Sequence, residues 1–377
     1  MNALDYAKEL VSFDSVSRSS NVAVTDFAQG ALTKLGFETE RLEYDDEWGV
    51  RKACVVGRKG AWPASGGLAY FGHTDVVPAD PWLFAEHGPF TPTVKDGRLY
   101  GRGSCDMKGS VACMLAAAGE FPAERLKRPL YVTCTSDEEI GYGGAKEVAA
   151  RSQLYRAMVA GQAQAIIGEP TCLEVVYGHK GTYGFSATSR GVAAHSSTNK
   201  GVNANLAMIP FLVEMKQIHD ELERDPQWRN TEFDPPTVSW NIGINDHTKA
   251  VNITPPQSVC TVYFRPMPGQ DAESLMERAR RAAEKCGIEF RRGSGGPPLY
   301  VDPRSQFVQE VLQIAGRETP RTVAYGTDGV MLGELANKAV LGPGDIAQAH
   351  THDEWIALEQ LESGTRLYGR LIERYCC

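Results

Sequence analysis

The stretch LAYFGHTDVVP, residues 68–78, decides most of the fold. It begins as a short apolar run and turns polar at His73 and Asp75. A short apolar run that ends in polar residues predicts a buried strand. Parallel strands of this kind place their chemistry at their carboxyl ends, so we expect functional side chains along one sheet edge. Similar runs occur three more times, as KACVVG at 52–57, PLYVTCT at 129–135 and QAIIG at 164–168.

Helical patterns alternate with these strands, which is typical of an α/β layer. The clearest is the Ala-rich stretch Ser110–Glu120, whose residues have high helix propensity. We therefore predict a mixed, largely parallel sheet flanked by helices. The remaining expected elements are a helix at 22–36, a strand near 39–43, a helix at 304–316, a strand near 338–342 and a terminal helix at 357–374.

Residues 178–294 show a different order of elements, namely strand, helix, two strands, helix and strand. That order is typical of a small ferredoxin-like α+β sandwich. The Gly- and Pro-rich segment GSGGPPLYVDP, residues 293–303, marks its end. We expect a catalytic domain formed by 1–177 and 295–377, with 178–294 inserted as a lid or dimerisation domain. The elements expected in the insert are strands at 182–190, 237–244, 258–265 and 287–292 and helices at 203–222 and 271–286.

The composition is that of a globular protein, with 42% hydrophobic and 23% charged residues among 377, which suits two domains. The net charge of −8 argues against nucleic acid as a partner, because phosphate binding needs a basic surface. Nine cysteines without a CxxC pair favour reduced thiols, and we expect Cys376 and Cys377 in a solvated tail. The first residues lack a signal peptide's basic start and apolar block, and no apolar run could span a bilayer. These features predict a cytoplasmic protein without a membrane partner.

Candidate metal ligands follow several of the expected elements, and each alone would usually be structural. Together on one sheet edge, their carboxylates would repel one another unless cations lay between them. Imidazole and carboxylate ligands suit zinc, cobalt or manganese rather than calcium. Two histidines and three carboxylates exceed the needs of one catalytic zinc ion, so we predict two ions bridged by one carboxylate. The candidates are His73, Asp106, Glu169, His350 and one of the adjacent Glu138 and Glu139.

At this point the chain resembles a known family, the two-zinc deacylases and carboxypeptidases. That family includes acetylornithine deacetylase, succinyl-diaminopimelate desuccinylase, glutamate carboxypeptidase and the aminoacylases. The resemblance covers essentially the whole chain and is nearest to acetylornithine deacetylase in the C-terminal block. It rests on the blocks GHTDVVP, YGRGSCDMKG, TSDEEIGYGGAK, GEPT, AAHSS, AVNITP, FRPMP and GPGDIAQAH, which fall in the family's order and spacing.

The resemblance implies a ligand for each metal position. Asp106 is similar to the carboxylate that bridges the two zinc ions. His73 and Glu169 would complete one zinc site, and Glu139 and His350 would complete the other. His352 competes with His350, but the family's ligand lies four residues before the glutamate that here occupies position 354, which selects His350.

The resemblance also implies the catalytic groups. Asp75 is similar to the carboxylate that orients the His73 imidazole, and such a partner fixes the tautomer of a ligand histidine. Glu138 is similar to the general base that takes a proton from the metal-bridging water. Cys105 and Cys134 lie near these blocks, but we expect them to be small buried hydrophobic residues rather than nucleophiles.

In the insert, the resemblance implies three further residues. His195 in AAHSS is similar to a histidine that hydrogen-bonds the oxyanion, often from a partner subunit, which makes a homodimer plausible. Asn252 and Arg265 are similar to groups that hold the substrate carboxylate, for which the planar guanidinium is suited.

Three functions remain open from the sequence. The first is deacylation of a small N-acyl amino acid, N-acetylornithine or N-acetylcitrulline, in arginine biosynthesis. The second is another hydrolase on the same scaffold, such as a succinyl-diaminopimelate desuccinylase, a dipeptidase or a glutamate-type carboxypeptidase. The third is a non-catalytic metal-dependent binding protein, which would predict the loss of Glu138 or of a ligand, and neither is lost.

Overall fold

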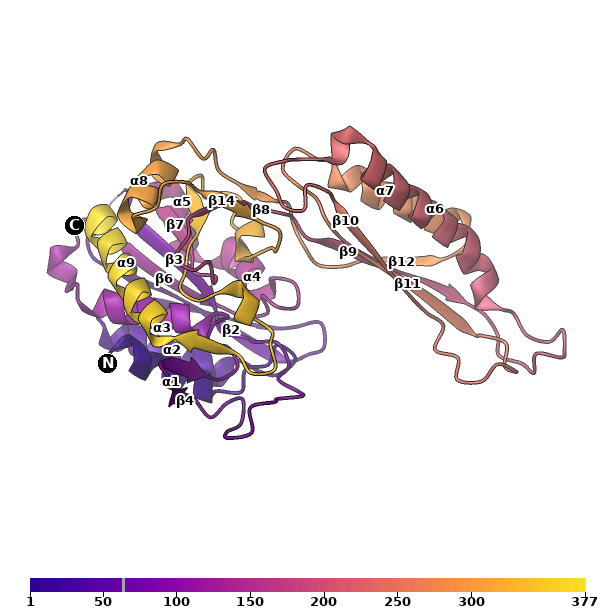
Figure 1. Ribbon diagram of the computed structural model, residues 1–377, viewed down its shortest axis with the longest axis horizontal. Helices are drawn as coiled ribbons and strands as arrows, with labels where there is room; N and C mark the ends of the chain where they lie inside the picture. Colours follow the sequence, from indigo (N-terminus) through magenta and orange to yellow (C-terminus); the bar gives the residue numbers. More distant parts are fainter. Residues whose placement is uncertain (63–64) are drawn as a thin grey trace. The chain divides into compact units, whose positions relative to one another are not determined.

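The computed structural model describes residues 1–62 and 65–377. The chain divides into two compact units, each drawn in Figure 1. The first unit consists of Met1–Gly178, Tyr300–Arg321 and Thr327–Cys377. The second consists of His179–Leu299 and Thr322–Gly326.

Among the described residues, the first unit is built around a nine-stranded sheet. Its strands follow the order β1-β2-β6-β3-β7-β15-β8-β13, and β14 pairs with β8. The strands are β1 (Glu38–Asp45), β2 (Arg51–Lys59), β3 (Leu68–His73), β6 (Leu130–Thr135), β7 (Gln164–Ile167), β8 (Val176–His179), β13 (Leu299–Tyr300), β14 (Arg321–Val323) and β15 (Lys338–Val340).

The sheet is mixed, as expected, and its parallel part is the four central strands. β6, β3, β7 and β15 run parallel to one another. β1 and β2 run antiparallel at one side, because residues 46–50 join them as a short hairpin turn. β8 pairs antiparallel with β15 at the other side. The carboxyl ends of the parallel strands therefore share one edge of the sheet.

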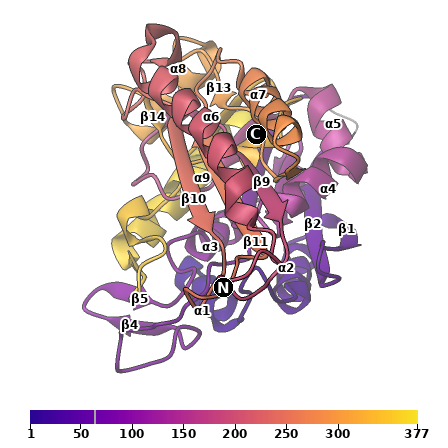
Figure 2. The ribbon, with the colours of Figure 1, turned by 90° about the vertical axis from the view of Figure 1, so that its right-hand side faces the viewer.

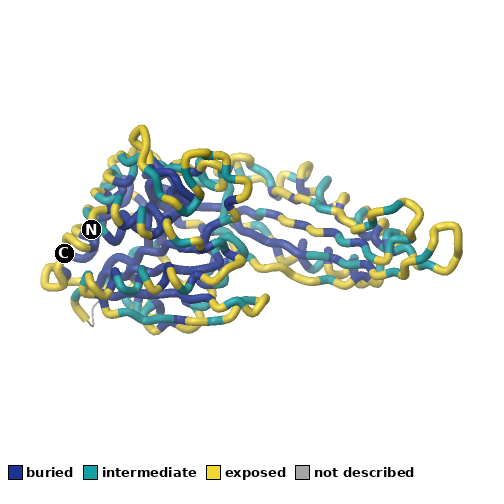
Figure 3. Tube along the Cα trace, turned by 90° about the horizontal axis from the view of Figure 1, so that it is seen from below, coloured by how far each residue is buried: buried dark blue, intermediate teal, exposed yellow. Residues whose placement is uncertain are grey.

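Helices cover both faces of this sheet, and two adjacent residues of β3 contact helices on opposite faces. Tyr70 lies against Tyr368 of α9, with ring centroids 5.4 Å apart, and its hydroxyl lies 2.8 Å from Ser110 Oγ of α3. Phe71 points to the other face, against Tyr155 of α5. Figure 3 shows the buried strands between these layers. The helices of the first unit are α1 (Ala3–Ser12), α2 (Val22–Lys34), α3 (Lys108–Gly119), α4 (Gly143–Arg151), α5 (Gln153–Gly161), α8 (Gln306–Ala315) and α9 (Leu358–Cys376).

The end of the chain differs from the sequence prediction. Cys376 is fully buried as the last residue of α9, and its sulfur lies 3.5 Å from the carbonyl oxygen of Pro129. The prediction of a solvated tail was wrong for Cys376, because the apolar stripe of α9 continues to the last helical residues. Cys105 and Cys134 are buried, as expected.

A small antiparallel sheet joins distant parts of the first unit. It consists of β4 (Thr93–Lys95), β5 (Arg98–Tyr100) and β16 (Trp355–Ala357), in the order β16-β5-β4. Trp355 pairs with Tyr100, and the amide of Gly101 donates to the carbonyl of Glu354. This pairing brings the segment that ends in β16 beside the Gly-rich turn that follows β5.

The second unit has the predicted order of elements. Its antiparallel sheet follows the order β10-β11-β9-β12, which is the ferredoxin-like arrangement. α6 and α7 lie side by side on one face of this sheet (Figures 1 and 2). The elements are β9 (Tyr183–Arg190), α6 (Ala204–Arg224), β10 (Ser239–Asn245), β11 (Gln257–Arg265), α7 (Ala272–Lys285) and β12 (Glu289–Arg292). Within the described part of the chain, no helix combines the length and apolar character needed to cross a membrane.

Candidate metal centre

Three parallel strands deliver side chains to the same edge of the large sheet. His73 ends β3 and pairs in register with Thr135, which ends β6. Glu138 and Glu139 therefore follow β6 next to His73. β7 ends beside β3, and Glu169 follows it by two residues. This shared register is the physical reason why residues far apart in sequence gather here.

His73 lies deepest in the cluster. Its Nδ1 is 2.9 Å from the carbonyl oxygen of Asp75, and an N–H donated there leaves the Nε2 lone pair free for a ligand. Nε2 lies 3.2 Å from Asp106 Oδ1 and 3.8 Å from Glu169 Oε1. His73, Asp106 and Glu169 thus converge around one small volume.

His350 approaches Asp106 from the opposite side. Its Nε2 lies 3.4 Å from Asp106 Oδ2 and 3.1 Å from Glu139 Oε2. Each oxygen of the Asp106 carboxylate therefore faces a different histidine, as a bridging carboxylate would. His352 is exposed.

The donor set fits divalent cations. His73, Asp106 and Glu139 offer ligand atoms that all lie within 4.8 Å of one another. His73, Glu138 and Glu169 do the same, so the carboxylate of Glu138 lies among the donors as well. Zinc, cobalt and manganese all accept such nitrogen and oxygen ligands.

The pKa shifts of the clustered side chains also favour a site for cations. Burial raises the pKa of Glu169 to about 8, and the Asp106 carboxylate adds to the shift. Burial also raises the pKa of Glu139, and burial together with Glu169 raises the pKa of Glu138 well above its usual range. Hydrogen bonds with Asp106 and Glu139 raise the pKa of His350 to about 10. Protein groups alone leave the negative charge here poorly compensated, and bound divalent cations would supply the missing charge.

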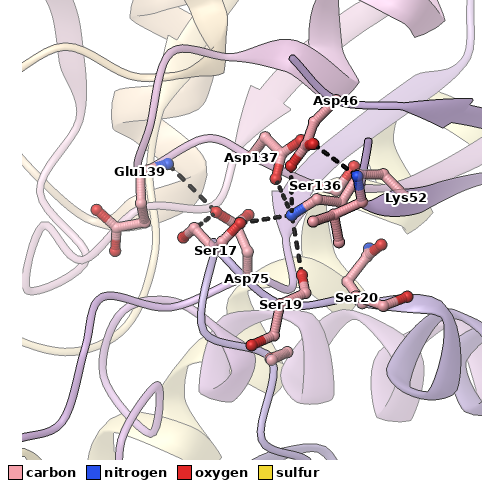
Figure 4. Close-up of polar contacts among 12 residues, drawn as sticks. Ser17, Ser19, Ser20, Asp46, Lys52, Asp75, Ser136, Asp137 and Glu139 are labelled. Carbon is pink, nitrogen blue, oxygen red and sulfur yellow. Dashed lines mark hydrogen bonds and ion pairs between the residues drawn. The ribbon is translucent and has the colours of Figure 1, made fainter. Parts of the chain in front are cut away.

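The Asp75 carboxylate accepts hydrogen bonds from the backbone amides of Glu138 and Glu139. Its Oδ1 accepts the amide of Glu138 at 3.2 Å, and its Oδ2 accepts the amide of Glu139 at 3.3 Å. Ser17 Oγ donates to Asp75 Oδ2 at 2.8 Å. Figure 4 shows Glu139 and Ser17 around Asp75. The carboxylate thus fixes the turn after β6, while the main chain of the same residue orients His73.

Glu354 is a supporting residue that the sequence analysis named only as a marker for His350. Its Oε1 accepts the amides of Cys105 at 2.8 Å and Asp106 at 2.9 Å. Its Oε2 accepts the amide of Gly103 at 2.9 Å and Arg102 Nη1 at 2.7 Å. Arg102 and Glu354 are both buried. The pair therefore holds the turn that carries Asp106.

Arg102 also donates hydrogen bonds to two other loops of the candidate metal centre. Its Nη2 donates to the carbonyl of Thr351 at 2.9 Å and, at 3.3 Å, to that of Pro78. Thr351 follows His350, and Pro78 ends the GHTDVVP block. No local sequence signal identifies Arg102, because its partners lie in segments that the pairing of β5 with β16 brings together.

The three expected residues of the insert lie in the second unit. His195 and Ile253 form an isolated β-bridge, and the amide of Ser196 donates to the carbonyl of Asn252, so His195 and Asn252 lie on adjacent loops. Both residues are exposed. His195 Nδ1 lies 2.7 Å from Ser197 Oγ.

Arg265 ends β11 in the same unit. Its guanidinium carbon lies 5.2 Å from the centroid of the Tyr263 ring. Its Nη1 is shielded from solvent and has no hydrogen-bond partner among the described residues. A buried donor of this kind is available for a ligand.

Comparisons with known proteins agree on one family. The profile of "Peptidase family M20/M25/M40" matches residues 69–374. An acetylornithine deacetylase of Myxococcus xanthus is 35% identical, over 98% of this chain and 96% of the relative. An acetylornithine deacetylase of Proteus mirabilis is 32% identical, over 96% of this chain and 92% of the relative. The structure of an M20 family metallo-carboxypeptidase from Sulfolobus solfataricus is similar in fold, with a TM-score of 0.75 at 17% identity and 99% of both chains covered.

Proposed function

The chain belongs to peptidase family M20/M25/M40 and is a metal-dependent amide hydrolase, and from this premise we propose that it deacetylates N-acetylornithine or N-acetylcitrulline in arginine biosynthesis. The observation that carries the substrate class is the full-length similarity to acetylornithine deacetylases at more than 30% identity. We further propose that the enzyme works in the cytoplasm and that its resident metals are zinc, which cobalt or manganese can replace.

We assign the two metal positions from the distances in the cluster. His73 and Glu169 would hold one cation, Glu139 and His350 the other, and Asp106 would bridge them. When bound, the cations would polarise the amide carbonyl and lower the pKa of a shared water. The separate contacts of the two Asp106 oxygens with the two histidines support this assignment.

Glu138 carries the proton in this mechanism. Its carboxylate lies among the metal donors, and its amide is fixed by Asp75, so the side chain starts from a defined position. Glu138 would take a proton from the attacking water and deliver it to the nitrogen that leaves. A base of this kind contributes about 10²–10⁴ to the rate.

Substrate binding is proposed for residues of the second unit. Arg265 Nη1 is a shielded donor without a hydrogen-bond partner among the described residues, which suits bidentate recognition of the substrate carboxylate. Asn252 would assist it. His195 would donate to the oxygen that becomes negative during attack.

We also propose a homodimer formed through the second unit. Leu206, Ile209 and Val213 follow one another at helical spacing on α6, and they are 67%, 54% and 53% exposed. β10 is an edge strand of the four-stranded sheet of the second unit, and among the described residues no strand pairs with its outer side. An apolar helical stripe beside a free edge strand supports self-association across a two-fold axis.

A substrate panel tests the proposed reaction. Purified enzyme reconstituted with zinc or cobalt is assayed with N-acetylornithine, N-acetylcitrulline, N-succinyl-diaminopimelate and several dipeptides. The Glu138→Gln variant, purified in parallel, controls for contaminating hydrolases. We expect the highest kcat/KM with one of the two N-acetyl amino acids. A tenfold or greater preference for the succinyl compound or for a dipeptide would reject the proposed substrate.

A further inference from the structure

Lys52 is a buried cation beside the candidate metal centre. Its side chain is 0% exposed, and it is the second residue of β2. Its Nζ lies 2.8 Å from Asp137 Oδ1 and 3.6 Å from Asp46 Oδ2. It also donates to the carbonyl oxygens of Ser17 and Ser19. Figure 4 shows the ammonium at the centre of these partners.

One group of partners belongs to the segment that flanks His73 and Asp75. Backbone hydrogen bonds join Ser17 to Val76 and Val76 to Ser15. Ser15 Oγ donates to the carbonyl of Thr74 at 2.6 Å, and Ser17 Oγ reaches the Asp75 carboxylate. By fixing the carbonyls of Ser17 and Ser19, Lys52 anchors the segment that holds Asp75.

The other partner, Asp137, precedes Glu138 and Glu139 directly. Asp137 has a left-handed backbone conformation, with φ of +57°, which costs free energy for a residue other than glycine. Its Oδ2 accepts the hydroxyl of Tyr44 at 2.7 Å, and its Oδ1 faces Lys52. These two contacts hold the turn in the conformation that aims Glu138 and Glu139 at the cluster.

We propose that Lys52 is a positioning residue for the reaction. Its ammonium links the turn at Asp137 to the Ser17–Ser19 segment, and this link fixes the positions of Glu138 and Glu139 relative to Asp75. The proposal rests on the roles given above to Glu138 and Glu139. The hydrogen-bond and ion-pair partners of the Lys52 ammonium among the described residues are Ser17, Ser19, Asp46 and Asp137, none of them a proposed ligand, so its effect would pass through the turn after β6. The Asp75 carboxylate also joins the two segments, through Ser17 Oγ and the amides of Glu138 and Glu139, and Lys52 adds a cationic link between them at Asp137.

A set of four proteins tests this role: wild type, Lys52→Met, Lys52→Met with Asp137→Asn, and Lys59→Met. Lys52→Met alone leaves the Asp137 carboxylate buried without a cation, so it can fail to fold for that reason. The double variant removes both charges and keeps Asn at a position whose left-handed backbone Asn tolerates. Lys59 is the matched control, because it is a buried lysine on the same strand whose Nζ donates to the carbonyl of Ala118 and lies 5.3 Å from the centroid of the Phe37 ring, away from the candidate metal ligands.

The readouts are kcat, KM, the thermal midpoint of the metal-free protein and titration with cobalt alone, followed by its visible spectrum. In the double variant we expect the thermal midpoint to return toward that of Lys59→Met. We expect kcat to stay about 10–100-fold below wild type with KM within about threefold, and binding of one cobalt equivalent to weaken about 10–100-fold. Lys59→Met should keep wild-type kcat and cobalt binding.

The outcomes separate this proposal from the proposed function. The double variant could recover kcat and cobalt binding along with its thermal midpoint. That result would mean that Lys52 only balances the charge of Asp137, and it would overturn the positioning role. If wild type itself binds no cobalt, or if Glu138→Gln is fully active, the proposed function fails, independently of Lys52.

Discussion

Glu354→Gln should destabilise the first unit by about 3–6 kcal/mol. The carboxylate is 1% exposed and accepts four hydrogen bonds, from Arg102 and from the amides of Gly103, Cys105 and Asp106. Gln offers one oxygen and turns an NH2 group toward two of these donors, and hydrogen bonds to a charged group contribute about 1.5–3 kcal/mol each. Breaking a buried ion pair from one side costs about 3–5 kcal/mol, and this cost overlaps with the first. The total approaches the whole stability of many domains, about 5–15 kcal/mol.

The control for this variant is Glu373→Gln. Glu373 and Arg125 form an ion pair at 2.7 Å, the same distance as Glu354 and Arg102, but their side chains are 57% and 50% exposed. An exposed pair contributes about 0–1 kcal/mol. The assay is urea unfolding of the metal-free proteins, followed by circular dichroism. If Glu354→Gln loses no more free energy of unfolding than Glu373→Gln, the buried pair does not hold the Asp106 turn as described.

Three further predictions follow from the same structure. Glu138→Gln should keep the wild-type metal content and lower kcat by about 10²–10⁴, measured with metal analysis beside steady-state kinetics; an unchanged kcat would remove Glu138 as the base. Burial raises the pKa of Asp328 from 3.8 to about 7, so the folded protein binds more protons than the unfolded chain between these values and its stability falls as pH rises through this window. Asp328→Asn should remove up to about 4 kcal/mol of that decline in urea unfolding of metal-free protein, and an unchanged pH slope would contradict the assignment. Ile209→Arg on the exposed stripe of α6 should shift a dimer to monomer in light scattering without loss of fold, whereas Leu83→Arg, at an exposed position of the first unit, should not; equal masses in the two variants would reject this interface.

The sheet and the gathering of candidate ligands at its edge could be predicted because their signals are local. An apolar run followed by a polar residue marks both a buried strand and the side chain at its end, as at His73 and Glu169. The shared register of β3, β6 and β7 then follows from parallel pairing. Asp106 and His350 lie in turns without a periodic pattern, so the residues alone made them candidates and the family resemblance gave each its expected metal position.

The supporting residues could not be predicted, because their partners are distant in sequence. Arg102 meets Glu354 across 252 positions only after β5 and β16 have paired. A lysine at the start of an apolar strand is ordinarily exposed, and Lys52 is buried only because Ser17, Ser19 and Asp137 surround it. Side-chain networks of this kind depend on tertiary contacts, which hydrophobic periodicity does not encode.

The most direct test of the metal centre is a count of bound cobalt in two proteins, wild type and Asp106→Asn. Each is stripped with a chelator, equilibrated with cobalt alone and analysed for metal per chain. Because one carboxylate faces both histidines, wild type should bind two ions, and Asp106→Asn should retain fewer than one at the same free cobalt concentration. Two ions retained by Asp106→Asn, or no more than one bound by wild type, would contradict a bridged pair at this sheet edge.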